Sequence, residues 1–392
     1  MDPLNPIFAL AVTCSAMLAA YWTRARVALP TTGSRFSTID GLRGYLALGV
    51  FIHHGAIWHG YVRTGIYGAT SSHFYNNLGK GSVTLFFMVT GLLFCSKILE
   101  ARGQIDWLRM FVSRVMRLAP MYVVTVAAAA AIIALLSHFQ AHVSAGNMAK
   151  TVVSWLFFTV PADPDINGMS ATRPLLGPTW TLRYEWLFYL SLPGIAAMLR
   201  RSTPIGLIAL SVAAVAFASW RGPMLPALGF VGGFVATLAI RSGILSKIAN
   251  TPAATLVAIG CLAAAVMGFE TQFSVSQTAL LMVAFCLVAC GNSLFGLLER
   301  ATSKQVGEVT YSIYLLHSIV LFILFEAVVG TSRAATLSAE QHWGLVIVAC
   351  PVLFVLSLVC FNFVEAPAMQ RVSQVATRIR ERFARPAHPR SI

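Results

Sequence analysis

The sequence predicts an all-α protein, a polytopic helix bundle that crosses a membrane many times. Of its 392 residues, 57% are hydrophobic and only 11% are charged, whereas soluble domains carry roughly 25% charged residues. The apolar residues gather in runs close to the roughly 20 residues that a helix needs to cross a bilayer. No long hydrophilic domain separates these runs. The composition therefore argues against a water-soluble enzyme.

Eleven apolar segments are expected to span the membrane. They lie near residues 7–23, 44–61, 81–99, 115–137, 183–199, 205–220, 226–242, 252–269, 277–298, 309–329 and 343–364. The first is an extra N-terminal anchor within residues 1–34, and about ten core helices form a membrane domain of residues 35–365. Residues 366–392 are expected to form a basic, amphipathic tail at the cytoplasmic face.

The longest polar interval, residues 138–182, separates the fourth and fifth predicted spans. Within it, residues 152–158 are apolar but too few to cross a bilayer. We therefore expect a short re-entrant or interfacial helix at this position.

The basic residues lie mostly on one side of the predicted bundle. The net charge is +14, and the predicted spans place 21 of the 28 Lys and Arg residues on one side and 7 on the other. Because cytoplasmic loops carry the excess of Lys and Arg, the C-terminus is expected in the cytoplasm. Asp2 before the first span and Arg24 after it favour an uncleaved anchor over a signal peptide. The charge thus reflects topology, so we expect a lipid bilayer and no nucleic acid as a partner.

A cation and an imidazole share the second predicted span. Ten residues, nearly all apolar, separate Arg43 from His54, which corresponds to about 16 Å along a helix. Ionisable groups at membrane depth are costly and usually functional. His54 is thus a candidate base behind a basic entrance, whereas the neighbouring His53 is expected to be a packing or interfacial residue.

Three further polar clusters interrupt the apolar spans. Arg114 and Arg117 share a helix face and could clamp phosphate oxygens, or they could simply anchor the span as positive-inside residues. Glu185 lies where a span begins on the outer side, and it could instead be an interfacial carboxylate paired with a nearby arginine. A third cluster occurs at spacings of three residues, which predicts one helix face toward the bundle interior; its members are Tyr311, Tyr314 and His317. Its tyrosines could also be ordinary core aromatics.

No metal site is expected. The seven cysteines lie in or beside apolar spans, and none pairs with another Cys and His ligands at zinc spacing. Free cysteines of this kind usually behave as small buried hydrophobic residues.

Taken together, the polar clusters occur in the order and spacing of one known family. The motifs are residues 39–44 with Arg43 followed by His54, residues 85–91, Arg114-x-x-Arg117-Leu118-x-Pro120, residues 180–189 with Glu185 and Pro193, and Tyr311-Ser312-x-Tyr314-x-x-His317. The chain resembles the membrane acyltransferase-3 family, which O-acylates bacterial cell-surface carbohydrates and some other hydroxyl compounds. It departs from the family pattern at Thr90, where Ser is common, and in the additional N-terminal span.

The resemblance implies an O-acyltransferase of the bacterial inner membrane that takes its acyl group, expected to be acetyl, from cytoplasmic acyl-coenzyme A. This donor is a co-substrate, and no permanently bound cofactor is expected. The family's essential Arg-x10-His pair maps onto Arg43 and His54. Some members carry a fused extracytoplasmic esterase-like domain. None follows here, so the membrane domain would acylate its acceptor itself or pass the acyl group to a separate protein.

The residues suggest roles within such a reaction. The phosphates of the donor would bind Arg43, Arg114 and Arg117, with Tyr314 beside them. A neutral His54 could take the proton from an acceptor hydroxyl. Tyr311, Tyr314 or His317 could polarise the thioester carbonyl or orient the acceptor. Glu185 could hold the imidazole's tautomer or bind the acceptor.

Several alternatives remain open from the sequence alone. Transfer could be direct or pass through an acyl-protein intermediate, and the acceptor could be a surface polysaccharide, an exopolysaccharide, a lipid-linked precursor or a small metabolite. A transporter or flippase of a polysaccharide intermediate is the competing class, with His54, Glu185 and His317 along a proton or substrate path. The motif order and the absence of an internal repeat argue against this class.

Overall fold

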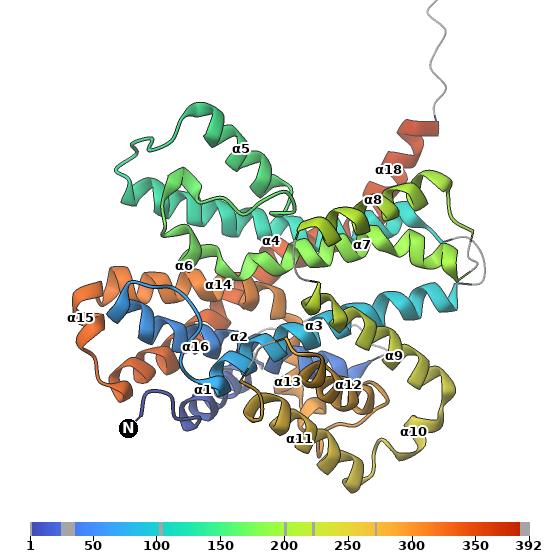
Figure 1. Ribbon diagram of the computed structural model, residues 1–392, viewed down its shortest axis with the longest axis horizontal. Coiled ribbons are helices and arrows are strands. Elements are labelled where there is room, and N and C mark those ends of the chain that lie inside the picture. Colours follow the sequence, from blue (N-terminus) through green and yellow to red (C-terminus); the bar gives the residue numbers. More distant parts are fainter. Residues whose placement is uncertain are drawn as a thin grey trace, which may run out of the picture.

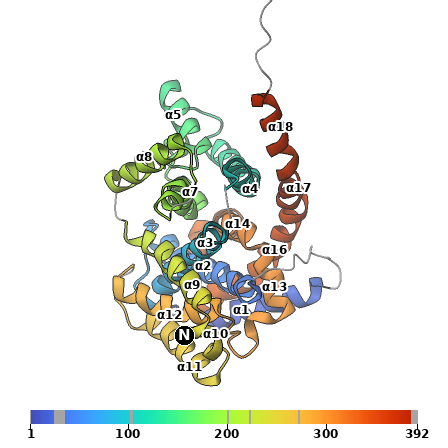
Figure 2. The same cartoon turned by 90° about the vertical axis from the view of Figure 1, so that its right-hand side faces the viewer.

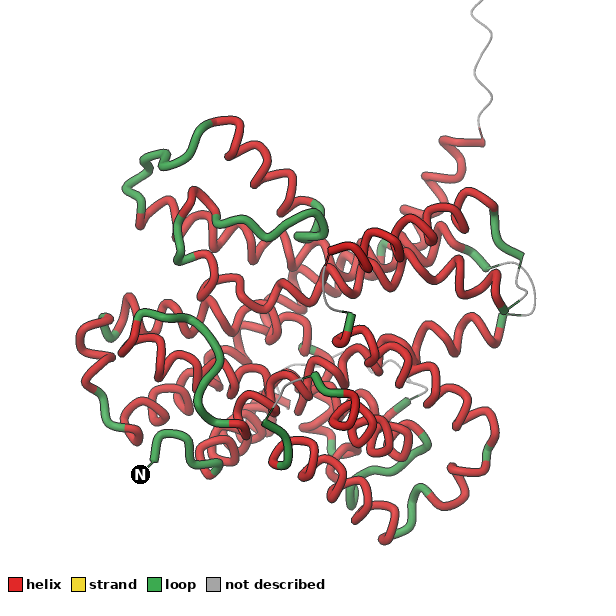
Figure 3. Tube along the Cα trace, in the orientation of Figure 1, coloured by secondary structure: helices red, strands yellow, loops and turns green. Residues whose placement is uncertain are grey.

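A computed structural model of the protein describes residues 2–24, 36–101, 105–199, 202–221, 224–270 and 273–384. Over these residues the chain forms helices joined by loops and contains no strand, as Figure 3 shows. The prediction of an all-α helix bundle is therefore confirmed. Residues 25–35 and 385–392, which include part of the predicted anchor and tail, lie outside the described residues.

Each of the eleven predicted spans overlaps a helix, although the helix within the predicted span 277–298 ends at Ala289. These helices are α1 (Ile7–Arg24), α2 (Ser37–Thr64), α3 (His73–Glu100), α4 (Trp107–Leu136), α7 (Trp180–Met198), α8 (Ile205–Arg221), α9 (Leu228–Ser242), α11 (Pro252–Met267), α12 (Val275–Ala289), α14 (Thr310–Phe322) and α16 (Ala339–Cys360). Two of them continue as π-helical turns, η5 (Ile323–Val328) after α14 and η6 (Phe361–Glu365) after α16. Six stretches of the described chain are long and apolar enough to cross a membrane, and three shorter apolar helices accompany them.

Short helices fill the connections and the C-terminal region. They are α5 (Ala145–Leu156), η1 (Ile166–Gly168), α6 (Thr172–Leu176), η2 (Gly177–Thr179), η3 (Leu225–Ala227), α10 (Ile244–Ile248), η4 (Leu297–Glu299), α13 (Ala301–Glu308), α15 (Thr331–Thr336), α17 (Ala366–Gln370) and α18 (Val372–Ala384). Helices α17 and α18 form the described part of the predicted amphipathic tail. Both pack along α4.

The helices that carry the polar clusters run side by side through the bundle. Figure 1 shows α2, α3, α4 and α7 crossing the view lengthwise, and Figure 2 shows the same helices nearly end-on. In the lower layer α3 packs on α2 and α9, and α14 packs on α2, α16 and α4. Helices α4 and α7 form an upper layer over α3 and α14. The site therefore forms between these two layers.

Small residues allow a close helix crossing between α3 and α9. A Cβ atom on Gly91 would lie 2.5 Å from the carbonyl oxygen of Phe230, and one on Gly233 would lie 2.2 Å from that of Met88. Both distances are far shorter than any real Cβ contact, so only glycine fits at either position. Helices in membranes use such small residues because close backbone approach maximises van der Waals contact.

The polar interval between α4 and α7 folds into a capping segment, residues 138–179. The predicted short helix is present as α5, which begins seven residues earlier than the apolar run and leaves Val152 and Leu156 exposed. Trp155 anchors it, because its carbonyl accepts from the Tyr122 hydroxyl at 2.8 Å and its indole donates to the Pro164 carbonyl at 3.1 Å. This segment forms one wall of a pocket in the bundle.

Candidate active site

Helix α2 carries both members of the Arg-x10-His pair. It runs without interruption from Ser37 to Thr64, so Arg43 and His54 occupy opposite halves of one helix, about 16 Å apart along its axis. Each side chain lines a different cavity. We call the cavity that contains His54 the histidine pocket and the cavity that contains Arg43 the basic pocket.

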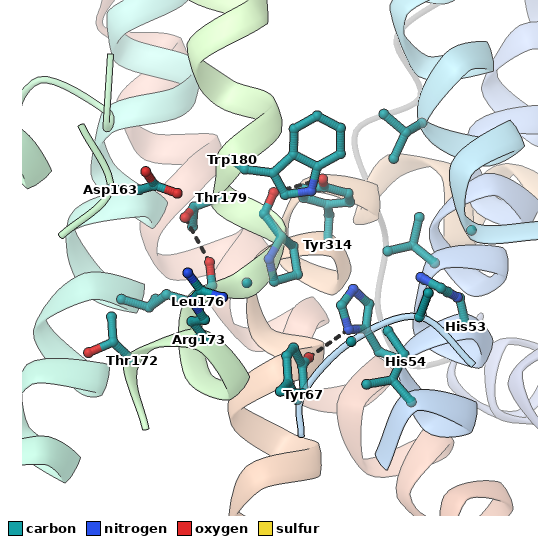
Figure 4. A pocket seen from close by; sticks show the side chains of 18 of the residues that line it. His53, His54, Tyr67, Asp163, Thr172, Arg173, Leu176, Thr179, Trp180 and Tyr314 are labelled. Carbon is teal, nitrogen blue, oxygen red and sulfur yellow. Dashed lines mark hydrogen bonds between the residues drawn. The ribbon is translucent and has the colours of Figure 1, made fainter. Parts of the chain in front are cut away.

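The histidine pocket has a volume of about 440 Å³. Its walls come from α2 and the loop after it, α3, the start of α7, α14 and the capping segment. They include His54, Tyr67, Trp155, Trp180 and Tyr314. In Figure 4, His53 and His54 lie on one side, Trp180 and Tyr314 lie above, and the capping-segment residues Asp163, Thr172 and Arg173 lie opposite. The pocket thus combines an imidazole with aromatic faces and hydrogen-bonding side chains.

The His54 ring is held from one side. Its Nδ1 lies 2.8 Å from the Tyr67 hydroxyl, and the two rings lie 6.1 Å apart between centroids. On another side the bare backbone of Gly177 approaches, where an added Cβ would lie 4.0 Å from His54 Cε1. With Nδ1 bonded to Tyr67, Nε2 is the nitrogen left for chemistry.

A second imidazole lies next to His54. The ring centroids of His54 and His317 are 4.9 Å apart. Because the carbonyl oxygen of Ile313 can only accept, His317 donates to it from Nδ1 at 3.2 Å, and in the neutral ring Nε2 is then an acceptor. His317 is completely buried, and its Nε2 has no partner among the described residues.

His53 packs closely on α3. It is buried, and its ring lies on the backbone of Gly79, where an added Cβ would come within 2.4 Å of the imidazole. His53 also lines the histidine pocket, so its expected packing role stays a prediction.

The basic pocket has a volume of about 290 Å³ and contains Arg43, Arg114 and Arg117 together with Lys97. The guanidinium of Arg114 lies over the Phe94 ring, 5.0 Å from the ring centroid, and this contact helps to hold Arg114 in place. The buried Nε of Arg114 has no hydrogen-bond partner among the described residues. Arg43 forms an ion pair with Asp40, in which Nη1 lies 3.9 Å from Oδ1. The structure thus places the three arginines around one cavity, and their shared charge suits an anion.

Glu185 belongs to the basic pocket and does not line the histidine pocket. Its carboxylate accepts a hydrogen bond from Tyr189 and interacts electrostatically with Arg114, Arg117 and Arg43. The structure gives the Nδ1 contact of His54 to Tyr67, so it does not support the idea that Glu185 holds the imidazole's tautomer. Arg183 lies over the Tyr184 ring at 5.2 Å.

The two tyrosines of α14 differ in their positions. Tyr311 lines only the basic pocket, and its hydroxyl donates to the carbonyl oxygen of Leu118 at 2.9 Å. Tyr314 lines both pockets. Its hydroxyl lies 2.7 Å from Thr181 Oγ1 and 2.9 Å from the Pro178 carbonyl oxygen. Tyr314 and Val83, which also lines both pockets, therefore separate the two cavities.

The spacing prediction for α14 is confirmed as to position, because Tyr311, Tyr314 and His317 are all buried in the bundle. Several polar pocket residues were not predicted, among them Tyr67 and Lys80. Tyr67 lies in the loop between α2 and α3, where no motif marks it. Lys80 lies 5.2 Å from the ring centroids of both Trp180 and Phe273, and its place at the edge of an apolar span was the signal that could have found it.

A comparison with protein families matches residues 36–362 to the model of an acyltransferase domain. Comparisons with curated proteins and with solved structures return no match. The family match includes every residue that lines the two pockets and all the candidate site residues. It does not extend to α1, α17 or α18.

Proposed function

This chain belongs to the acyltransferase-3 family and is a multi-pass membrane acyltransferase, and from this premise we propose its donor, acceptor and mechanism. The donor is acyl-coenzyme A, with acetyl as the acyl group. The acceptor is a hydroxyl of a carbohydrate, either a cell-surface polysaccharide or its lipid-linked precursor. The enzyme acts in the bacterial inner membrane with its C-terminus in the cytoplasm.

The basic pocket supports the choice of donor. Arginine forms strong, often bidentate hydrogen bonds to phosphate, and Arg43, Arg114 and Arg117 converge on one cavity beside Lys97. The pantetheine arm of coenzyme A spans roughly 15–20 Å at extended-chain spacing. This length matches the distance of about 16 Å along α2 from Arg43 to His54. A donor held by its phosphates in the basic pocket can therefore extend its thioester to the histidine pocket.

The single observation that carries the proposal is the shared wall at Tyr314. The basic pocket and the histidine pocket meet at this residue. The two pockets are lined by opposite halves of α2 and α3. A donor and an acceptor entering from the two sides can meet only near it. Movement of the Tyr314 side chain would open the passage between them.

The residues of the histidine pocket support acyl transfer to a hydroxyl. In the tautomer whose Nδ1–H donates to the Tyr67 oxygen, His54 offers the Nε2 lone pair as a base. The acceptor oxygen attacks the thioester carbonyl carbon as His54 takes the hydroxyl proton. The C–S bond then breaks, the acyl ester remains on the acceptor, and the proton passes from His54 to the departing thiolate. His317 lies beside His54, and since its Nδ1 donates to Ile313 its Nε2 can accept a hydrogen bond from an acceptor hydroxyl but cannot stabilise an oxyanion.

The same pocket supports a carbohydrate acceptor. Sugars present apolar faces as well as many hydroxyls, and Trp155 and Trp180 supply aromatic surface beside Asp163, Asp165 and Arg173. The transporter or flippase alternative loses its support because the chain belongs to an acyltransferase family.

The proposal is tested by following label from radioactive acetyl-coenzyme A into surface glycans in membranes that contain the protein. Membranes with Arg117→Lys should need more donor for half-maximal transfer, because lysine keeps the charge but loses the planar fork. Arg117→Ala and Arg43→Ala should weaken donor binding further. If both alanine variants bind acetyl-coenzyme A as the wild type does, the donor site lies elsewhere. If no label reaches glycans with the wild type, the proposed substrates are wrong.

A further inference from the structure

A third cavity, which we call the vestibule, adjoins the basic pocket. It has a volume of about 570 Å³ and lies where α3 ends and α4 begins. Phe94, Lys97, Arg114 and Arg117 line both the vestibule and the basic pocket. One ligand can therefore occupy the two cavities together.

The C-terminal helices form one wall of the vestibule. Met369 of α17 and Val372 and Ser373 at the start of α18 face it across from α4, and Figure 2 shows α17 and α18 running beside α4. Ser373 accepts a hydrogen bond from Arg109 Nη2 at 3.4 Å. Arg380 forms an ion pair with Asp106. Residues of this wall lie beyond residue 362, where the family match ends.

The vestibule carries a strong positive charge. Its described lining includes Lys97, Arg109, Arg114 and Arg117, and Asp106 is its one carboxylate. That carboxylate is already engaged, because it accepts from the backbone N–H of Arg109 and from Arg380. These contacts, with Arg380 the largest contribution, hold the pKa of Asp106 below its usual value. The four cations of the lining therefore remain in excess.

Apolar side chains lie beside these cations. Ile98, Ile105 and Met110 come from the α3–α4 side, and Met369 and Val372 come from the C-terminal helices. A basic surface alone would suit a bare phosphate, whereas cations beside two facing apolar walls suit a phosphorylated group with a flat aromatic base.

We propose that the vestibule binds the nucleotide of the donor, an adenosine bisphosphate, with its base between the α3–α4 side and the C-terminal helices. This inference rests on the proposed function, in which acyl-coenzyme A is the donor. Arg109 and Lys97 contact the ribose phosphate, and Arg114 and Arg117 hold the pyrophosphate where the vestibule joins the basic pocket. The C-terminal helices are thus part of the donor site.

The test compares three ligands on the full-length protein in phosphatidylcholine nanodiscs, with binding measured by calorimetry. The ligands are coenzyme A, 3′-dephospho-coenzyme A and pantetheine. Arg109→Ala should weaken coenzyme A about tenfold, the effect of losing one charge-assisted hydrogen bond, and should change pantetheine binding little. Val372→Trp, which fills the space of the base, should weaken both nucleotide ligands and spare pantetheine. Arg378→Ala is the matched control, because it removes the same charge from an exposed position of α18 outside the vestibule.

The outcomes separate this inference from the proposed function. If the wild type binds none of the three ligands, the proposed donor is wrong. The second outcome is that the wild type binds coenzyme A and that both variants, Arg109→Ala and Val372→Trp, bind it as tightly as the wild type does. The nucleotide then lies elsewhere, and this inference is overturned. If the vestibule binds a lipid headgroup instead of a nucleotide, the variants should bind coenzyme A as the wild type does. In nanodiscs of mixed lipid, Arg109→Ala should then retain less phosphatidylglycerol. That result would also overturn the inference.

Discussion

Two adjacent histidines at the end of an apolar run have different surroundings. Both line the histidine pocket, but His54 contacts Tyr67 whereas the ring of His53 packs on Gly79. The sequence could rank His54 above His53 through its distance from Arg43. It could not identify the Tyr67 contact, because that contact depends on how the loop after α2 folds back over the helix.

We predict that His54→Ala lowers acyl transfer by about 10² to 10⁴, the usual effect of removing a general base. The protein should still insert and fold. His53→Ala is the matched control and should have a much milder effect. The measurement is transfer from acetyl-coenzyme A in membranes with equal amounts of each protein. Wild-type turnover in His54→Ala would exclude the catalytic role, and equal losses in both variants would indicate a packing defect of α2.

Tyr67 is predicted to position the His54 ring by accepting from Nδ1–H. Tyr67→Phe removes this acceptor but keeps the aromatic ring, so the turnover number should fall about tenfold, as expected for the loss of one hydrogen bond. The KM for acetyl-coenzyme A should stay unchanged, because Tyr67 does not line the basic pocket. Steady-state kinetics separate the two quantities. A rise in KM with normal turnover would contradict a positioning role.

At the scale of helices, hydropathy predicted where the helices lie in the sequence but not which side chains meet between them. All eleven expected spans overlap helices, because long apolar runs fold as helices in a bilayer. The face of α14 followed from the spacing of its polar residues. The environment of Glu185 followed only in part: a pairing with an arginine was one of the alternatives, but nothing in a single sequence states that α7 turns this carboxylate toward the arginines of α4 and α2. The division into two pockets also depends on packing, through the contact of Tyr314 with Thr181.

The α3–α9 crossing gives a prediction for stability. Gly233→Ala places a Cβ 2.2 Å from the Met88 carbonyl oxygen and 2.5 Å from Leu92 N, so the helices must separate, at a cost of about 1–3 kcal/mol. Gly260→Ala in α11 is the matched control, since its Cβ would meet nothing within 4 Å. Thermal unfolding in detergent should show a lower midpoint for Gly233→Ala alone. Equal midpoints for the two variants would mean that this crossing does not limit stability.

For the whole molecule, the split of basic residues predicts which face meets the cytoplasm. The basic pocket and the vestibule lie with the basic ends of α3 and α4, and the histidine pocket lies with the capping segment at the other ends. The account thus assigns the donor to the cytoplasmic face and the acceptor to the opposite face. Family membership establishes acyl transfer, whereas this sidedness remains a prediction.

The most direct test measures transfer in vesicles of known orientation, with radioactive acetyl-coenzyme A supplied on one side only. Inverted vesicles expose the cytoplasmic face, so added donor should label acceptor glycans inside them, and the His54→Ala protein should abolish this labelling. Right-side-out vesicles should show no transfer from externally added donor. Transfer from donor added only to right-side-out vesicles would place the basic pocket on the outer face and contradict the account.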